Sequence, residues 1–210
     1  MLKKTTSQKV STFLNGIDEA RLIKALDACV AHLARLGCPV VSLLQPGLTA
    51  AEVARFEATL PFQLTEELRA VYRWRNGTRA QEGDILESLW FYPGFYLVSL
   101  ERACEIFKER KDAPQWRKGW FPLFEDGAGD FFVVPCKKKA ANRAPVIGFI
   151  HGEPEQLVEY LDVTSMIETL ADCYAQGAFF VNADGFLDMD DDAHQRIARQ
   201  HNPGVTEWQS

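Results

Sequence analysis

The chain has 210 residues, of which 47% are hydrophobic and 25% charged, and its formal net charge is −6. This length suits one sizeable globular domain, or one domain with an appendage. Because nucleic-acid binding depends on clustered Lys and Arg side chains that contact phosphates, an acidic chain is a poor candidate for it. The excess of carboxylates suits either a basic protein partner or solubility alone.

The five cysteines are odd in number and scattered, and no Cys-x-x-Cys pair occurs. This pattern predicts buried, reduced thiols and no zinc site. The first residues are polar beyond Leu2, and no uninterrupted apolar run approaches the roughly 20 residues of a membrane span. We therefore expect a cytoplasmic protein without a signal peptide or a membrane contact.

The first predicted element is a helix over residues 18–36, where apolar residues recur at three- and four-residue spacing. Gly37 is a natural C-terminal stop for this helix. Residues 38–44 form a short apolar run before Pro46-Gly47, and this run is expected to be extended.

A helical hairpin is the strongest local prediction. Thr49 and Glu52 have the spacing of a capping box, which marks the start of one helix. Thr65 begins a second helix, which is expected to end at Asn76-Gly77.

The remaining chain predicts short strands interspersed with helices. Proline and glycine residues separate the strands, which are expected at 89–98 (as two pieces), 120–124, 131–134, 146–150, 157–161 and 179–181. Further helices are expected over 100–111, from Ser165 with Glu168 as its capping partner, and over 191–201. The order predicts a single α+β domain with a central mixed or antiparallel sheet, helices packed against it and an N-terminal helical hairpin. Its core is expected at about 48–177, with 178–210 as a hairpin and helix tail.

No catalytic, cofactor-binding or metal-ligating constellation is apparent. The four histidines lack metal-ligand spacing, and neither a nucleophile elbow nor a phosphate-binding loop occurs. His151 is better interpreted as a surface turn residue than as a general base. The acidic run after Asp184 does not fit a calcium loop, because Gly185 at the sixth position would place Phe180 at the first. The basic run 137–143 is interpreted as a solvated turn.

The stretch from Leu48 to Gly77 combines a Thr-x-x-Glu-Val helix start with a second helix that ends in Asn-Gly. The residues of this pattern are Thr49, Glu52, Val53, Glu57, Leu60, Leu64, Leu68, Arg69, Trp74, Asn76 and Gly77. The pattern resembles the Smi/Knr type of the SUKH superfamily, and later parts resemble it in order as far as Tyr174. The family usually has Leu-Pro before the second helix; here Leu64-Thr65 takes that place, and Thr65 can cap the helix instead.

This resemblance implies an α+β protein that binds another protein and has no catalytic motif. Many bacterial members resemble immunity proteins that neutralise toxins such as nucleases. Fungal relatives resemble scaffolding regulators of cell-wall assembly. An immunity protein is therefore the first functional expectation, a regulatory module that binds a host protein is the alternative, and an enzyme or small-ligand-binding protein is the third.

Acidic side chains that no core requires are the predicted contacts for a partner, such as a basic toxin domain. Trp90 and Tyr92 are added as aromatic anchors, with the alternative that both belong to the core. The acidic candidates are Glu82, Asp84, Glu125, Asp126, Asp130, Asp184 and Asp188. The expected assembly is a monomer or a weak homodimer.

Overall fold

The structure is a computed structural model, and it describes residues 17–209. The helices are α1 (Glu19–Leu36), α2 (Val40–Leu43), α3 (Ala50–Glu57), α4 (Glu66–Trp74), α5 (Leu100–Arg110), α6 (Val163–Ala175) and α7 (Asp191–His201). Two short 3₁₀ helices are η1 (Leu86–Leu89) and η2 (Thr206–Gln209). The strands are β1 (Leu44–Pro46), β2 (Arg75–Thr78), β3 (Tyr96–Leu97), β4 (Trp120–Glu125), β5 (Phe131–Pro135), β6 (Val146–Phe149), β7 (Leu157–Tyr160), β8 (Phe179–Val181) and β9 (Leu187–Met189).

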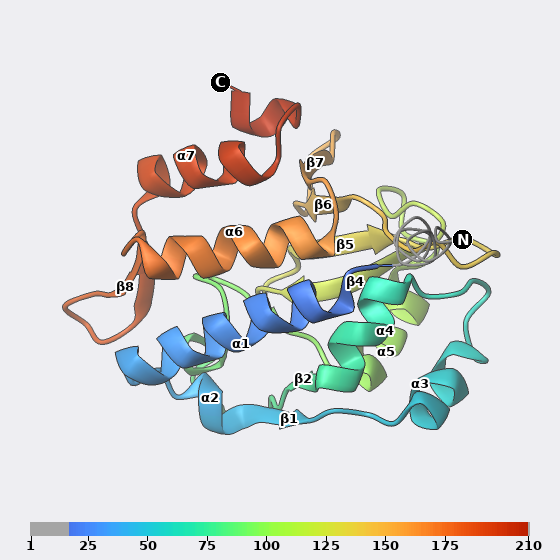
Figure 1. Cartoon of the computed structure of the whole chain (residues 1–210). Coiled ribbons are helices and arrows are strands. Elements are labelled where there is room, and N and C mark those ends of the chain that lie inside the picture. The colour runs from blue at the N-terminus through green and yellow to red at the C-terminus, as the bar shows by residue number, and fades with distance from the viewer. Residues whose placement is uncertain (1–16, 210) are drawn as a thin grey trace, which may run out of the picture.

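The main sheet has five strands in the order β3-β4-β5-β6-β7, and β1-β2 and β8-β9 form separate pairs. Every pairing is antiparallel, so the central sheet is antiparallel and the expected α+β class is confirmed. Figure 1 shows α6 in front of this sheet, with α1 on one side of it and α7 on the other. The apolar faces of these layers enclose one continuous hydrophobic core.

The predicted helix starts are largely confirmed by side-chain caps. The Thr49 hydroxyl accepts a hydrogen bond from the Glu52 backbone N–H, and the Glu52 side chain accepts one from the Thr49 N–H, which completes the capping box. The Thr65 hydroxyl caps α4 by accepting from the Leu68 N–H. Gly37 ends α1 in the left-handed conformation, with φ 75°.

Two local predictions were wrong, and a third was confirmed in part. Residues 40–43 form a turn of helix rather than an extended run, and only 44–46 are a strand. Of the two strands expected over 89–98, the structure has the two-residue strand β3 and, around Pro93-Gly94, an isolated antiparallel bridge between Tyr92 and Phe95. Helix α6 begins at Val163 with Asp162 as its cap, while the Glu168 carboxylate pairs with Arg21 of α1.

The N-terminus of α6 is held by a carboxylate from another helix. Glu67 of α4 is fully buried, and it accepts hydrogen bonds from the backbone N–H groups of Val163 (3.3 Å) and Thr164 (3.1 Å) and from the Thr164 hydroxyl (2.6 Å). These are among the first donors of α6, which have no partner within the helix. Burial raises the pKa of Glu67 to about 7, although the hydrogen bonds from Thr164 oppose the shift.

We predict that Glu67→Ala lowers the free energy of unfolding by about 3 kcal/mol, because it leaves buried N–H groups without an acceptor and opens a cavity. Denaturant melts at pH 7 would measure the loss. Glu66→Ala is the matched control, since Glu66 is a partly exposed neighbour that pairs with Arg69, and it should cost less than about 1 kcal/mol. Equal losses for the two variants would contradict the prediction.

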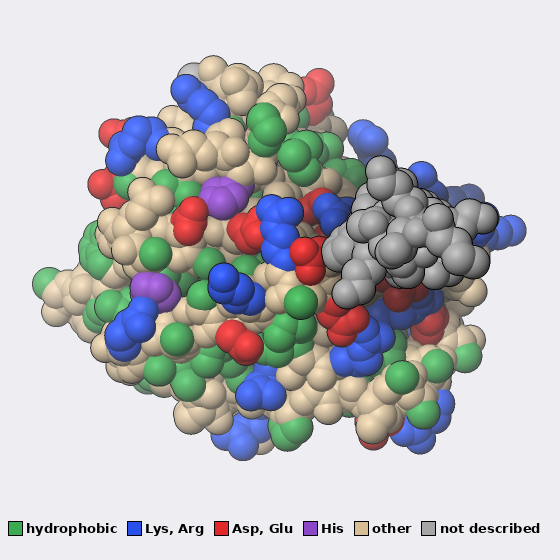
Figure 2. All heavy atoms as spheres, in the orientation of Figure 1, with side chains coloured by type: hydrophobic (Ala, Val, Ile, Leu, Met, Phe, Trp, Pro, Cys, Tyr) green, Lys and Arg blue, Asp and Glu red, His purple; other side chains and the backbone are tan. Residues whose placement is uncertain are grey.

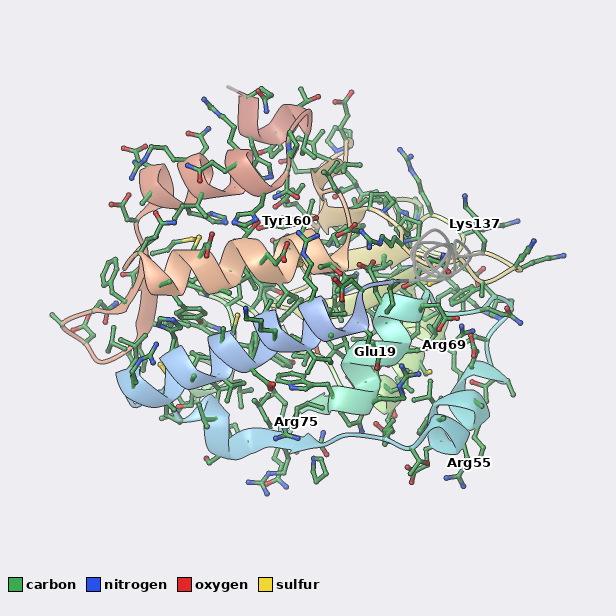
Figure 3. All side chains as sticks on the ribbon, in the orientation of Figure 1. Glu19, Arg55, Arg69, Arg75, Lys137 and Tyr160 are labelled. Atoms are coloured by element: carbon green, nitrogen blue, oxygen red, sulfur yellow. The ribbon has the colours of Figure 1, made fainter. Side chains whose placement is uncertain are left out.

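The C-terminal helix docks through a buried histidine. His194 of α7 is 5% exposed, and its ring lies 5.3 Å from Trp208, 5.6 Å from Phe179 and 5.9 Å from Tyr92. Its Nε2 atom is 3.4 Å from the hydroxyl of Tyr160, the β7 residue that Figure 3 shows between α6 and α7. Burial lowers the pKa of His194 to about 4, because the aromatic surroundings disfavour the charged ring.

We predict that His194 makes folding pH-dependent. Its pKa is about 4 in the fold and about 6.5 in an unfolded chain, so the unfolded state binds more protons between these values. The stability that depends on neutral His194 is complete above about pH 6.5 and is lost as the pH falls towards 4. The gap in unfolding free energy between wild type and His194→Gln should therefore shrink by about 3 kcal/mol from pH 7 to pH 4.

Denaturant melts across this pH range would test the change. The pKa of Glu67 is raised, which has the opposite effect on stability, but this contribution is common to both proteins and cancels in the difference. Replacement of the exposed His151 by Gln is the control and should leave the pH dependence unchanged. Parallel curves for wild type and His194→Gln would refute the proposed role of His194.

Candidate partner-binding surface

The residues of the Thr-Glu…Asn-Gly pattern have structural roles. Glu57 of α3 accepts hydrogen bonds from the Leu64 N–H (2.6 Å) and from the Arg69 guanidinium (2.6 Å). Arg69 also pairs with Glu66 at 2.5 Å and lies towards α3, as Figure 3 shows. This partly buried network joins α3 to α4, so these charges are used by the fold and not by a ligand.

The Asn-Gly pair fixes where α5 begins. The Asn76 side-chain oxygen accepts from the Leu100 N–H at 2.9 Å, and the side-chain amide donates to Glu101 at 2.8 Å. Gly77 has φ +70°, and a Cβ at this position would lie 2.4 Å from the Ser99 nitrogen. Only glycine permits this close approach of β2 to the start of α5.

A cleft of about 490 Å³ opens at this junction, between the end of β2, the first turns of α5 and the adjoining ends of β3 and β4. It is lined by Gln45, Thr78, Arg79, Ala80, Gln81, Tyr96, Val98, Ser99, Glu101, Arg102, Glu105 and Glu125. The cleft lies within the range of volumes typical of ligand sites, but it is open and polar. Such a shape suits a protruding side chain of a protein better than an enclosed small molecule.

The charge of the cleft is set by a row of carboxylates on α5. Glu101, Glu105 and Glu109 recur at four-residue spacing and therefore share one helix face. Arg102 lies among the carboxylates: its Nη1 atom is 3.4 Å from Glu105 and 3.2 Å from Glu109, and its Nε atom is 3.9 Å from Glu125. Arg79 also lines the cleft, so two guanidinium groups stand against Glu101, Glu105 and Glu125 of its lining and Glu109 beside it, and this surface keeps a negative excess.

The floor of the cleft contains a buried carboxylate. Glu125 is 6% exposed, and burial raises its pKa, although a hydrogen bond from Tyr96 and the charge of Arg102 oppose the shift. Thr78 is 3% exposed, and its hydroxyl has no hydrogen-bond partner among the described residues. Because buried polar groups are normally satisfied, the floor has unused hydrogen-bonding capacity.

Of the predicted acidic contacts, Glu125 alone lines this cleft. Glu82 and Asp84 are exposed on the loop that follows its rim. The turn after β4 lies against η1, the short helix that follows this loop, since a Cβ at Gly127 would be 2.9 Å from the Leu86 side chain. Asp126 and Asp130 belong to that turn, and their carboxylates are engaged by backbone N–H groups: Ala128, Gly129 and Asp130 donate to Asp126, and His151 donates to Asp130.

The remaining candidates are arranged differently from the prediction. Tyr92 is 4% exposed and packs on Phe95, Phe132 and Phe179, so the prediction of a surface anchor was wrong for this residue and its alternative as a core residue is confirmed. Trp90 is half-buried, and its indole N–H is buried without a partner among the described residues. Asp184 and Asp188 lie on the separate β8–β9 hairpin.

The sequence patterns did not single out Arg102 or the glutamates of α5 as candidate contacts for a partner. The signal was present, because the apolar residues Leu100, Cys104 and Phe107 already defined the buried face of the predicted helix. Glu101, Glu105 and Glu109 then had to lie on the exposed face. Ile85, which is 62% exposed beside Asp84, was also missed.

Other reactive groups do not form a site in residues 17–209. No cluster of His, Cys, Asp and Glu in this part of the chain has the arrangement of a metal centre. The five cysteines are free, and burial raises the pKa of their thiols, that of Cys136 to about 12. His151 is exposed in the β6–β7 turn. None of the described helices is long and apolar enough to cross a membrane.

Comparison with known proteins gives a family but no individual relative. No curated protein matches the chain. The model of the SMI1/KNR4 family (SUKH-1) matches residues 47–169, more than half of the chain, from the start of the α3–α4 pair to the middle of α6. The match contains the Thr49 capping box, the Glu57–Arg69 pair, the Asn76-Gly77 junction and the acidic cleft. The chain therefore belongs to the SMI1/KNR4 family (SUKH-1).

Proposed function

We propose that this protein is a non-enzymatic immunity protein, which binds a basic bacterial toxin domain through the acidic cleft at the N-terminal half of α5. Family membership supports an immunity protein or a protein like the cell-wall-assembly regulators. The observation that carries the proposal is the carboxylate row of α5 above the buried Glu125, since a cleft with a negative excess attracts cationic side chains. Exposed Ile85 beside the cleft would add apolar contact area.

A regulatory scaffold that binds a host protein could use the same surface. The genes next to this one distinguish the two roles: a toxin gene supports immunity, and its absence favours regulation. A pull-down from the source cells would then identify the partner.

We predict that Glu105→Lys together with Glu109→Lys slows association with the captured partner at least tenfold at low ionic strength and flattens its salt dependence. Both side chains are exposed, and the ion pairs that they form within residues 17–209 are with Arg102, so the fold should tolerate the change. Glu153→Lys with Glu155→Lys is the matched control, because each pair shifts the net charge from −6 to −2 and residues 153 and 155 are exposed away from the cleft.

Surface plasmon resonance with immobilised partner would measure both double variants. Selective slowing by the α5 pair supports the cleft as the interface. Equal slowing by both pairs would assign the effect to net charge, and unchanged kinetics for the α5 pair would exclude the cleft.

We also predict no hydrolase, transferase or nuclease turnover by the purified protein. The histidines are separated in the fold: His194 is buried among aromatic rings, whereas His151 is exposed in a turn. General acid–base chemistry needs a base within hydrogen-bond reach of the reacting group. Turnover that disappears on replacing His151 by Ala would overturn this prediction.

A further inference from the structure

A second concave surface lies at the other end of α5, away from the acidic cleft. One hollow of about 390 Å³ is lined by Pro61, Phe62, Phe107, Lys111, Asp112, Lys118, Gly119, Cys136 and Lys138. A second hollow shares Pro61, Phe62 and Lys138 with it and continues along α3. The two therefore form one groove, called here the Phe62 groove.

The floor of this groove is apolar and its rim is basic. Phe62 and Phe107 are 6% exposed, and their rings meet edge to face with centroids 4.9 Å apart. Lys111, Lys118 and Lys138 supply three ammonium groups against two carboxylates: Asp112, which lies 4.0 Å from Lys111, and Glu57, which is already paired with Arg69. On a chain of net charge −6, this local positive excess is unusual.

The segment that carries Lys138 is held in place by the backbone. The Gln63 N–H donates to the Lys137 carbonyl at 2.9 Å, and the Glu66 N–H donates to the Ala141 carbonyl at 3.1 Å. The Ala140 N–H in turn donates to the Gln63 side chain at 3.0 Å. Figure 3 marks Lys137 at the start of this segment, and Figure 2 shows Lys and Arg side chains gathered at that edge of the molecule. The basic run is thus fixed to the chain next to Phe62 rather than being a free loop.

We propose that the Phe62 groove binds a small amphipathic anion, an apolar chain or ring that ends in a carboxylate, sulfonate or phosphate. The apolar part would cover Phe62 and Phe107, and the anionic head would contact the rim lysines. An apolar floor with a few convergent polar groups is the usual composition of small-ligand sites, and its size is in their range. Charge complementarity selects an anion over a neutral ligand, since three ammonium groups outnumber the carboxylate of Asp112 and Glu57 is already paired with Arg69. The groove shares no lining residue with the acidic cleft, so this inference does not depend on the proposed function.

Titration of the full chain with 8-anilinonaphthalene-1-sulfonate, an aromatic sulfonate whose fluorescence rises in apolar surroundings, tests the proposal. We expect saturable enhancement that dodecanoate reverses, whereas inorganic phosphate and dodecanol at equal concentration do not. Backbone amide signals of Lys118, Gly119 and Lys138 should shift on dodecanoate addition. Displacement by phosphate alone would indicate a simple anion site, and equal displacement by dodecanol would remove the lysines from recognition; either result overturns the proposal.

Charge-reversal variants locate the site. Lys138→Glu and Lys118→Glu should each weaken dye binding at least fivefold, with unchanged thermal unfolding as the check on the fold. Lys139→Glu is the matched control, because Lys139 is adjacent in sequence and exposed but does not line the groove. Equal weakening by Lys139→Glu, an absence of saturable binding to the wild type, or full binding by Lys138→Glu would each refute the proposal.

Discussion

The buried N-terminus of α6 is the constraint on which the rest of the fold depends. Its first N–H groups would be unsatisfied inside the protein without two carboxylates: the distant Glu67 of α4 caps Val163 and Thr164, and the adjacent Asp162 caps Ser165. Asn202, at the end of α7, accepts from the Leu161 N–H just before this point and donates to Thr169. The α3–α4 pair, the end of β7 and the C-terminal helix α7 are therefore joined at one set of hydrogen bonds, and α6 is fixed between α1 and α7 (Figure 1).

The residues of the family pattern fix the start of α5 in a similar way, through polar contacts between segments that are distant in the chain. Asn76 and Gly77 hold the start of α5 against β2, and Glu57 with Arg69 holds α3 against α4. Because these polar residues are occupied by the fold, binding has to use side chains that the framework leaves free. Glu105 and Glu109 are exposed side chains of this kind, presented on a helix whose start is fixed by Asn76.

Helix α5 also links the two concave surfaces. Its first turns line the acidic cleft, while Phe107 and the following Lys111 line the Phe62 groove. Acidic residues at the start of a helix and basic residues at its end are both favoured by the helix dipole. The two surfaces differ in local charge because Glu101 and Glu105 line the cleft, whereas Lys111, which follows the helix, lines the groove.

The sequence alone determined the elements that local chemistry controls. The Thr49 capping box, the Thr65 cap and the turn between β4 and β5 were predicted because their hydrogen bonds join residues three or four apart, or because glycine marks the turn. The family followed from an ordered pattern of such local signals.

Only the tertiary structure decided how distant residues are used. Glu168 resembled a capping residue but pairs with Arg21, and Asp162 caps α6 in its place. Tyr92 resembled a surface anchor but packs in the core, and Glu125 is buried at the floor of a cleft. The reason is physical: burial and ion pairing depend on residues that are remote in the chain, and neither periodicity nor spacing records which remote residues will meet.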